Sequence, residues 1–253
     1  MGSEISPDGK WIAAECFREN ETNDSPLRVV SMDRSKDWKI YYRDYAHGED
    51  YGPRNIIEPY RWSKDGKYLY AMSGSIASGC CWLGIRYILL VRLDLETGQQ
   101  LELLEGGFDF KISDSDRYLM FTPPTYQKYD FAILGLQTWK TREIFLKFSK
   151  DFDLIYFVMS PADDKIVLPL FQQVEFNDYE VVSIGIIDLT TNKQKVLISG
   201  LKRGNELFPI RWVDATHVLL SDTGPDWGQV SQSSAKFWLL NIDSTQLTEA
   251  QGP

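Results

Sequence analysis

Apolar and polar residues alternate along this chain in a phrase that recurs five times. Each copy places a turn rich in Ser, Asp, Gly or Pro between two short apolar runs, a pattern typical of a tight β-hairpin. The copies are SPDGKWIAAE from Ser6, SKDGKYLYAM from Ser63, SDSDRYLMFT from Ser113, SPADDKIVLPL from Ser160 and VDATHVLLSD from Val213. Successive copies start 57, 50, 47 and 53 residues apart. An internal repeat therefore organises the whole chain.

Two further strands are expected after each hairpin. The third is a β-rich run that ends in a polar turn, at Asp33, Asp94, Gln137, Asp188 and Asp243. The fourth begins at Trp38, Gln100, Arg142, Gln194 and Gln246. Four strands per repeat and the lack of a helical period predict an all-β fold, a five-bladed β-propeller of four-stranded antiparallel blades.

The repeats also predict the domain organisation. They cover approximately 1–45, 56–105, 107–149, 153–201 and 206–250, so we expect one β-propeller domain over residues 1–253. A four-stranded sheet cannot bury both faces alone, and each blade must therefore pack on its neighbours. A β-sandwich is the alternative, but it would not require one phrase at a near-constant interval.

The first strand of each repeat has two different faces. One and three places before the turn stand large apolar residues, namely Trp62 and Tyr60, Ile112 and Phe110, Met159 and Phe157, and Trp212 and Ile210. Two places before the turn, on the opposite face, the copies carry Glu4, Arg61, Lys111, Val158 and Arg211. Equivalent positions lie at equal height in a propeller, so Arg61, Lys111 and Arg211 are candidates for an anion-binding site in the channel. Alternatively, each cation lies between blades and pairs with a local carboxylate such as Glu58 or Asp109.

The phrases SPDGKWIAAE and RWSKDGKYLYAM resemble the repeat of TolB-type, WD40-like (PD40) β-propellers over essentially the whole chain. Relatives of this kind include partner-binding periplasmic proteins and propeller domains of peptidases, so the resemblance implies partner binding and favours an exported location. TolB itself has a six-bladed propeller joined to a separate small domain, whereas this chain has five repeats. The later copies replace DGK by ADDK and DATH. Asp8, Gly9, Asp65 and Gly66 are interpreted as turn residues, because Asp bonds its own backbone and Gly accepts positive φ.

Long segments join the second and third strands of the repeats, and they are expected on one rim. They span 17–26, 73–86, 122–130, 171–180 and 221–235, and the link 43–59 between the first two repeats adds to them. Aromatic residues among Asp, Asn and Gln suit protein or carbohydrate contact. The partner-binding candidates are Tyr45, Tyr51, Trp82 and Trp227; alternatively, each aromatic side chain holds its own loop against a blade.

Composition narrows the classes of partner. The formal net charge of -9 and the pI near 4.8 argue against nucleic acid. No apolar run approaches the length of a membrane span, and the N-terminal residues MGSEISPDGK lack the regions of a signal peptide. Cys16, Cys80 and Cys81 have no zinc-ligand spacing. We therefore expect no metal and no cofactor, while the residues leave the compartment and the oligomeric state open.

Catalysis has one candidate arrangement. No nucleophile elbow occurs, and nothing places a histidine near Cys80 or Cys81. Some five-bladed propellers are glycoside hydrolases with two carboxyls around the channel, and Glu58, Asp109, Asp153 and Glu206 stand near the starts of first strands. The favoured interpretation is a non-catalytic scaffold for a protein, peptide or glycan. The alternative is a channel-mouth hydrolase that uses paired carboxylates.

Overall fold

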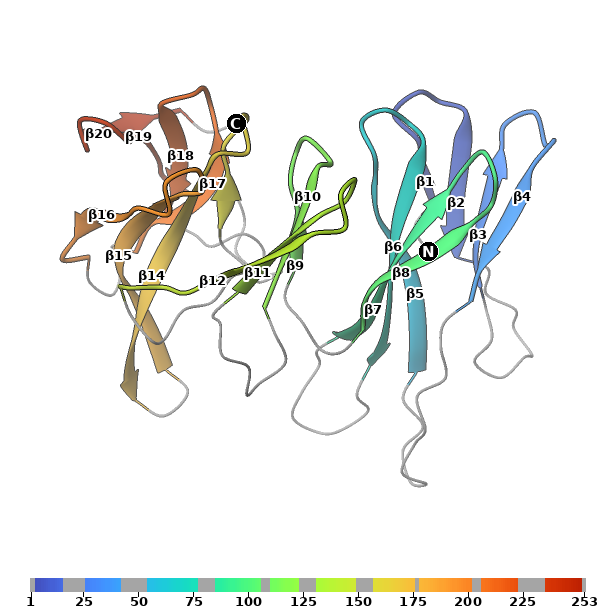
Figure 1. Cartoon of the computed structure of the whole chain (residues 1–253), viewed down its shortest axis with the longest axis horizontal. Helices are drawn as coiled ribbons and strands as arrows, with labels where there is room; N and C mark the ends of the chain where they lie inside the picture. The colour runs from blue at the N-terminus through green and yellow to red at the C-terminus, as the bar shows by residue number, and fades with distance from the viewer. Residues whose placement is uncertain are drawn as a thin grey trace. The chain divides into compact units, whose positions relative to one another are not determined.

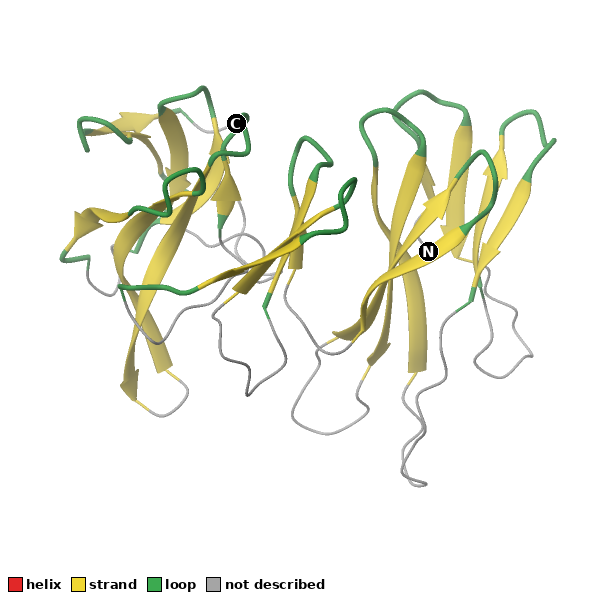
Figure 2. Ribbon diagram, viewed as in Figure 1, coloured by secondary structure: helices red, strands yellow, loops and turns green. Residues whose placement is uncertain are grey.

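The computed structural model describes residues 3–15, 26–41, 54–76, 85–105, 110–122, 131–148, 157–175, 178–201, 206–222 and 235–251. Figure 2 shows that these ranges contain strands joined by turns and loops, without a helix. The strands form five four-stranded antiparallel sheets within the described ranges, each made of four consecutive strands. The predicted architecture is thereby confirmed.

Each repeat of the sequence forms one sheet, which we call a blade (Figure 1). Blade 1 contains β1 (Ser3–Ile5), β2 (Trp11–Glu15), β3 (Leu27–Ser31) and β4 (Asp37–Ile40). Blade 2 contains β5 (Arg54–Trp62), β6 (Tyr68–Ile76), β7 (Ile85–Asp94) and β8 (Gln100–Glu105). Blade 3 contains β9 (Phe110–Ile112), β10 (Tyr118–Phe121), β11 (Phe131–Gly135) and β12 (Thr141–Ile144). Blade 4 contains β13 (Val158–Met159), β14 (Lys165–Glu175), β15 (Asp178–Asp188) and β16 (Gln194–Ser199). Blade 5 contains β17 (Phe208–Trp212), β18 (His217–Ser221), β19 (Phe237–Asn241) and β20 (Leu247–Ala250).

The contacts of the chain divide it into two compact units. The first, Met1–Phe108, holds blades 1 and 2, and the second, Asp109–Pro253, holds blades 3, 4 and 5. The single domain expected from the repeats remains a prediction.

Within each unit the hydrophobic core lies between neighbouring blades. In the first unit Ala13 and Leu27 of blade 1 share a cluster with Trp62 and Leu69 of blade 2. In the second unit one cluster joins blades 3 and 4, and another joins blades 4 and 5. Packing of neighbouring sheets against one another within each unit agrees with what the repeats predicted.

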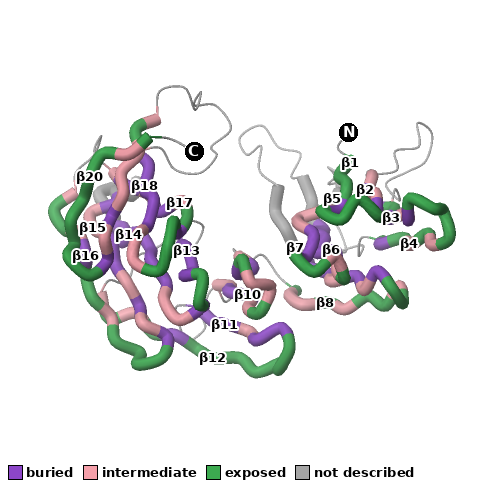
Figure 3. The backbone as a smooth tube through the Cα atoms, turned by 90° about the horizontal axis from the view of Figure 1, so that it is seen from above, coloured by how far each residue is buried: buried purple, intermediate pink, exposed green. Residues whose placement is uncertain are grey.

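Burial follows strand order within a blade. The second strands are largely buried, as in β10 and β18, whereas the fourth strands β4, β12 and β20 are mostly exposed. Figure 3 shows this gradient in blade 5, where β18 is mostly purple and β20 mostly green.

The repeated serine explains why the first hairpin recurs. Ser63 is buried, its hydroxyl donates to Asp65 Oδ1 at 2.8 Å, and it accepts a hydrogen bond from the Tyr68 backbone N–H at 2.9 Å. Equivalent bonds reach Ser6, Ser113 and Ser160 from the backbone N–H five residues later. The serine therefore satisfies a backbone donor that the turn leaves unpaired.

Two expected loop boundaries were wrong. Residues 73–86 and 171–180 were expected to be loops, but β6 continues to Ile76 and β7 starts at Ile85, while β14 continues to Glu175 and β15 starts at Asp178. Both hairpins have a register shift where the loop was expected to begin, at Ser73/Gly74 and at Leu170/Phe171. The change in hydrophobic pattern therefore marks a β-bulge inside a longer hairpin.

Candidate binding site

A β-bulge in the first strands of blades 2 and 5 positions two of the predicted cations. In β17, Pro209 pairs with Leu220 and Arg211 pairs with Leu219, so the pairing skips Ile210. The same irregularity lies between Pro59 and Arg61 in β5. A bulge redirects neighbouring side chains, and proline has no N–H for the sheet ladder. The alternation assumed for these strands was therefore wrong at the bulges, and the repeated Pro-x-Arg-Trp phrase was the signal.

A cavity of about 280 Å³ lies along the first strands of blades 3, 4 and 5. It brings together Lys111, Val158 and Arg211, the residues two places before the first turn of each blade. The other described residues of its lining are Ile112, Ser113, Asp114, Met120, Met159, Ile210 and Trp212. The repeats predicted that these three positions are equivalent, and in the second unit all three line the same cavity.

The two cations of this cavity are held differently. Lys111 is half-buried, and its Nζ donates to the Phe157 carbonyl at 3.0 Å and lies 5.8 Å from the centre of the Phe157 ring. Arg211 is exposed, and within the described ranges its guanidinium makes no hydrogen bond or ion pair. Asp114 is the one acidic residue that lines the cavity among the described residues.

The neighbouring tryptophan fixes the wall of this cavity. Trp212 is 8% exposed, and its indole Nε1 donates to the Val158 carbonyl of blade 4 at 3.2 Å. This bond joins the first strands of blades 4 and 5, which also lie side by side. The equivalent Trp62 Nε1 in blade 2 is buried and has no partner among the described residues.

The third predicted cation, Arg61, belongs to the first unit and is half-buried. In that unit, partial desolvation and then the charge of Glu58 raise the pKa of Glu4, which is nevertheless an exposed residue of β1. Glu58 and Glu206 are partly buried, whereas Asp109 and Asp153 lie outside the described residues. The carboxyl pair indicated here, Glu4 with Glu58, differs from the sets considered on the sequence, in which Glu4 was only a position of the ring.

A larger cavity of about 500 Å³ lies among the turns of blades 1 and 2. Its carboxylates include Asp8, Asp33 and Asp65, and each already accepts a hydrogen bond from the serine hydroxyl two places before it. The Ser31 hydroxyl is the main reason that the pKa of Asp33 falls to about 2. These residues stabilise turns, which agrees with the interpretation of Asp8, Gly9, Asp65 and Gly66 as structural.

The candidates on the long loops are not placed. Tyr45, Tyr51, Trp82 and Trp227 lie outside the described residues, as do Cys16, Cys80 and Cys81. No group of three or more His, Cys, Asp or Glu side chains in the described ranges could hold a metal ion. The same ranges contain no helix long and apolar enough to cross a membrane.

Comparison with solved structures decides the fold. The propeller domain of the trilobed protease from Pyrococcus furiosus is similar over 98% of this chain and 70% of its own, with a TM-score of 0.54 and 14% identity. Dipeptidyl peptidase 4 from Porphyromonas gingivalis is similar over 98% of this chain and 39% of its own, with a TM-score of 0.53 and 10% identity. This chain is a five-bladed β-propeller.

A TolB structure is also among those compared with this chain. TolB from Acinetobacter baumannii is 13% identical, with a TM-score of 0.45, and the propeller covers 53% of its length. The likeness at such identities is one of fold. No protein-family model and no curated protein matches the sequence.

Proposed function

We propose that this propeller is a non-catalytic scaffold that binds a protein partner, or a peptide or glycan, through the rim of its long loops. The observation that carries this proposal is the length of the hairpins that lead to two of those loops. β6 has 9 residues and β7 has 10, whereas β2 and β3 have 5 each. In blade 4, β14 and β15 have 11 residues each.

Pairing in these longer hairpins continues past the bulges to the ends of the strands. The β6–β7 register runs from Tyr68↔Asp94 to Ile76↔Ile85, and the β14–β15 register from Lys165↔Asp188 to Glu175↔Asp178 (Figure 1). At about 3.4 Å per residue, four extra residues extend a hairpin by about 14 Å. Ordered hairpins of this kind support a binding surface, because loops that carry recognition residues need a rigid base.

The recognition residues proposed for this rim are the four aromatic candidates of the sequence. Trp82 follows the β6 strand of blade 2, and Trp227 follows β18 of blade 5. Tyr45 and Tyr51 lie in the link between β4 and β5. Trp and Tyr commonly supply most of the binding energy of an interface.

Site-specific photocrosslinking tests the proposal. A photoreactive phenylalanine analogue replaces Trp82 or Trp227 in the full chain, and cells of the source organism supply the partners. We expect specific adducts from both positions. The matched control is Thr190, an exposed residue in the turn between β15 and β16, from which we expect none. Equal adduct yields from Thr190 would contradict binding through the long-loop rim.

Affinity measurements with the captured partner complete the test. Trp82→Ala and Trp227→Ala are each expected to weaken binding by about 2 kcal/mol or more while the melting temperature stays nearly unchanged. A large loss of stability with unchanged affinity would instead identify the two indoles as residues that hold their own loops.

The second candidate function is a hydrolase that uses paired carboxylates. The raised pKa of Glu4, caused by burial and by the charge of Glu58, is the observation in its favour. We would expect glycoside hydrolysis by the full chain, with loss of activity in Glu58→Gln and a shifted pH profile in Glu4→Gln. No hydrolysis across a panel of glycosides, or an unchanged rate in Glu58→Gln, would reject this candidate.

A further inference from the structure

We propose that the 280 Å³ cavity of blades 3, 4 and 5 binds a small organic carboxylate that carries an apolar group. The proposal is independent of the long-loop rim, because all its residues belong to first strands, first turns and β10. In this proposal the cations Lys111 and Arg211 bind the carboxylate of the ligand.

Charge is the first argument. Lys111 and Arg211 contribute two cations to the lining, and Asp114 contributes one carboxylate. The protein as a whole is acidic, with a formal net charge of -9. A local excess of positive charge in such a protein concentrates an anion at this cavity and not over the general surface.

The state of Arg211 is the second argument. An arginine guanidinium has five N–H donors in a fixed planar geometry and no acceptor. Arg211 makes no such bond within the described ranges, and it follows a β-bulge at Pro209/Arg211. Bulges redirect side chains next to functional sites. The planar guanidinium matches the two oxygens of a carboxylate.

Rigidity of the surroundings is the third argument. The Trp212 indole is tied to the Val158 carbonyl at 3.2 Å, and Lys111 Nζ to the Phe157 carbonyl at 3.0 Å. Both bonds cross from one blade to the next, so the walls of the cavity hold one another in place. A preorganised site loses less free energy on binding than one that must first become ordered.

Size and lining define the rest of the ligand. Six of the ten described lining residues are apolar: Ile112, Met120, Val158, Met159, Ile210 and Trp212. A volume of about 280 Å³ lies just below the usual range of small-molecule pockets, which is about 300 to 1,000 Å³. The cavity therefore suits a compact acid with one short aliphatic or aromatic group, and it is too small for a folded peptide.

The test is a titration of the full ¹⁵N-labelled chain with 3-phenylpropionate, monitored on the indole N–H resonances of its eight tryptophans. The Trp212 resonance is assigned with Trp212→Phe. We expect a saturable shift of the Trp212 resonance and a smaller or absent shift of the Trp62 resonance. Acetate and inorganic phosphate are expected to bind at least tenfold more weakly, and the neutral analogue 3-phenylpropanol likewise.

Charge-matched variants complete the test. Arg211→Gln is expected to weaken 3-phenylpropionate binding about tenfold or more, since a bond to a charged group is lost. Lys195→Gln on the outer strand β16 removes the same charge away from the cavity and is expected to leave binding unchanged. Circular dichroism verifies that both variants are folded.

Three results would overturn the proposal. One is equal weakening by Lys195→Gln and Arg211→Gln, which would show an unspecific effect of charge. Another is binding of phosphate or 3-phenylpropanol as strong as that of 3-phenylpropionate, which would refute the ligand class. The third is the absence of any saturable shift of the Trp212 resonance at millimolar ligand.

Discussion

Positive backbone φ angles recur at equivalent turn positions of the blades, and the residues there differ in how well they tolerate them. In the turn between the third and fourth strands these residues are Arg34, Gly98, Trp139, Asn192 and Thr245. Glycine adopts this conformation without steric cost, Asn tolerates it, and a β-branched or bulky side chain is strained. The same fold is therefore built with unequal local strain.

Replacement of Thr245 tests this strain. Thr245 has a φ of 59° and is exposed, and Thr245→Gly is expected to raise the free energy of unfolding by about 1 kcal/mol. The reverse change at the equivalent position, Gly98→Ala, should destabilise, because Gly98 has a φ of 75° and a Cβ there would lie 2.7 Å from the Trp38 ring. Urea denaturation measures both, and a loss of stability in Thr245→Gly would contradict the strain argument.

The two equivalent tryptophans before the first turn form a natural pair for a second test. Trp62 and Trp212 are both 8% exposed, but only Trp212 has a partner for its Nε1 within the described ranges. Replacement by Phe removes similar volume from both sites. Trp212→Phe should therefore cost about 1 kcal/mol more than Trp62→Phe, the net value of one hydrogen bond. Equal changes in the free energy of unfolding would show that the Trp212 bond contributes nothing.

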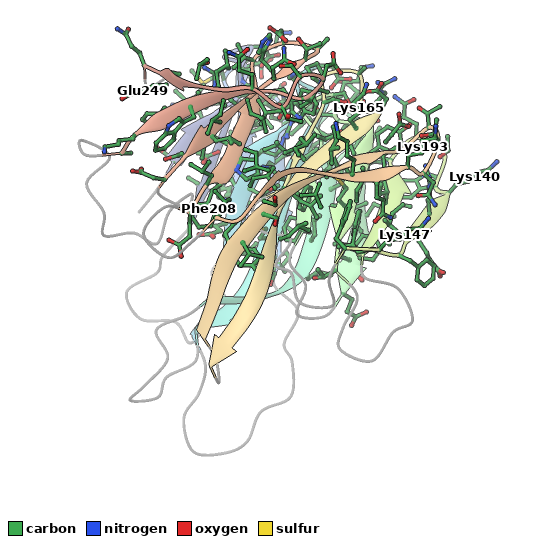
Figure 4. All side chains as sticks on the ribbon, turned by 90° about the vertical axis from the view of Figure 1, so that its left-hand side faces the viewer. Lys140, Lys147, Lys165, Lys193, Phe208 and Glu249 are labelled. Carbon is green, nitrogen blue, oxygen red and sulfur yellow. The ribbon has the colours of Figure 1, made fainter. Side chains whose placement is uncertain are left out.

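At the scale of elements, turns and outer strands join neighbouring blades through side-chain hydrogen bonds to backbone carbonyls. Gln100 at the start of β8 donates to the Lys39 carbonyl of blade 1, and Gln194 at the start of β16 donates to the Phe145 carbonyl of blade 3. Trp38 Nε1 donates to the Leu95 carbonyl at 3.1 Å, and Arg142 donates to the equivalent Leu189 carbonyl. Figure 4 labels the side chains of Lys147, which follows β12, and of Lys193, which lies in the turn before β16. Neighbouring blades thus repeat hydrogen bonds as well as apolar contacts.

Substitution of the buried serine in the first turn is expected to destabilise the hairpin that it closes. Ser63→Ala removes the acceptor of the Tyr68 backbone N–H and leaves that donor without a partner beside a residue that is 1% exposed. We expect a loss of about 1 to 3 kcal/mol in the free energy of unfolding. Ser244→Ala is the control, because Ser244 accepts from the Gln246 N–H in an exposed turn where water replaces it. Equal effects of the two substitutions would contradict the role of burial.

Acid sensitivity is a property of the whole molecule, since turns in several blades hold carboxylates. The Ser31 hydroxyl lowers the pKa of Asp33 to about 2, and the Thr216 backbone N–H lowers the pKa of Asp214 to about 2. The pKa values of Asp8, Asp65, Asp94, Asp164 and Asp188 are also lowered. A lowered folded-state pKa means that the unfolded chain binds more protons in acid. This stabilisation is present above the ordinary aspartate pKa of about 4 and is lost as the pH falls towards 2.

We therefore expect the urea midpoint to fall steeply between about pH 4 and pH 2. Asp33→Asn and Asp214→Asn should each reduce that slope. Asp243→Asn serves as the control, because no hydrogen bond is made by the Asp243 carboxylate within the described ranges. Glu4 acts in the opposite direction, since its raised pKa makes its charged form unfavourable as the pH rises above the ordinary value. A midpoint independent of pH in this window would contradict the role of the turn carboxylates.

The repeated sequence was sufficient to predict the blades but not all the elements within them. The Ser-x-Asp-x turn and the apolar runs around it are local signals, and each depends on residues within about ten positions in the chain. The hairpins that continue past Ser73 and Phe171 escaped this reasoning, because a bulge interrupts the alternation without ending the strand. The electrostatic effect of Glu58 on Glu4 was also missed. The two residues belong to different repeats, so no local pattern of the sequence relates them.

The sequence by itself determined the number of blades, the order of their strands and the equivalent places of Lys111 and Arg211 before the first turns, because hydrophobic period and turn chemistry are encoded locally. Only the tertiary structure decided that these two side chains line one cavity, that Lys111 bonds the Phe157 carbonyl and that Arg211 follows a bulge. Distances between separate repeats depend on how blades pack, and packing sums many weak contacts that no single segment specifies.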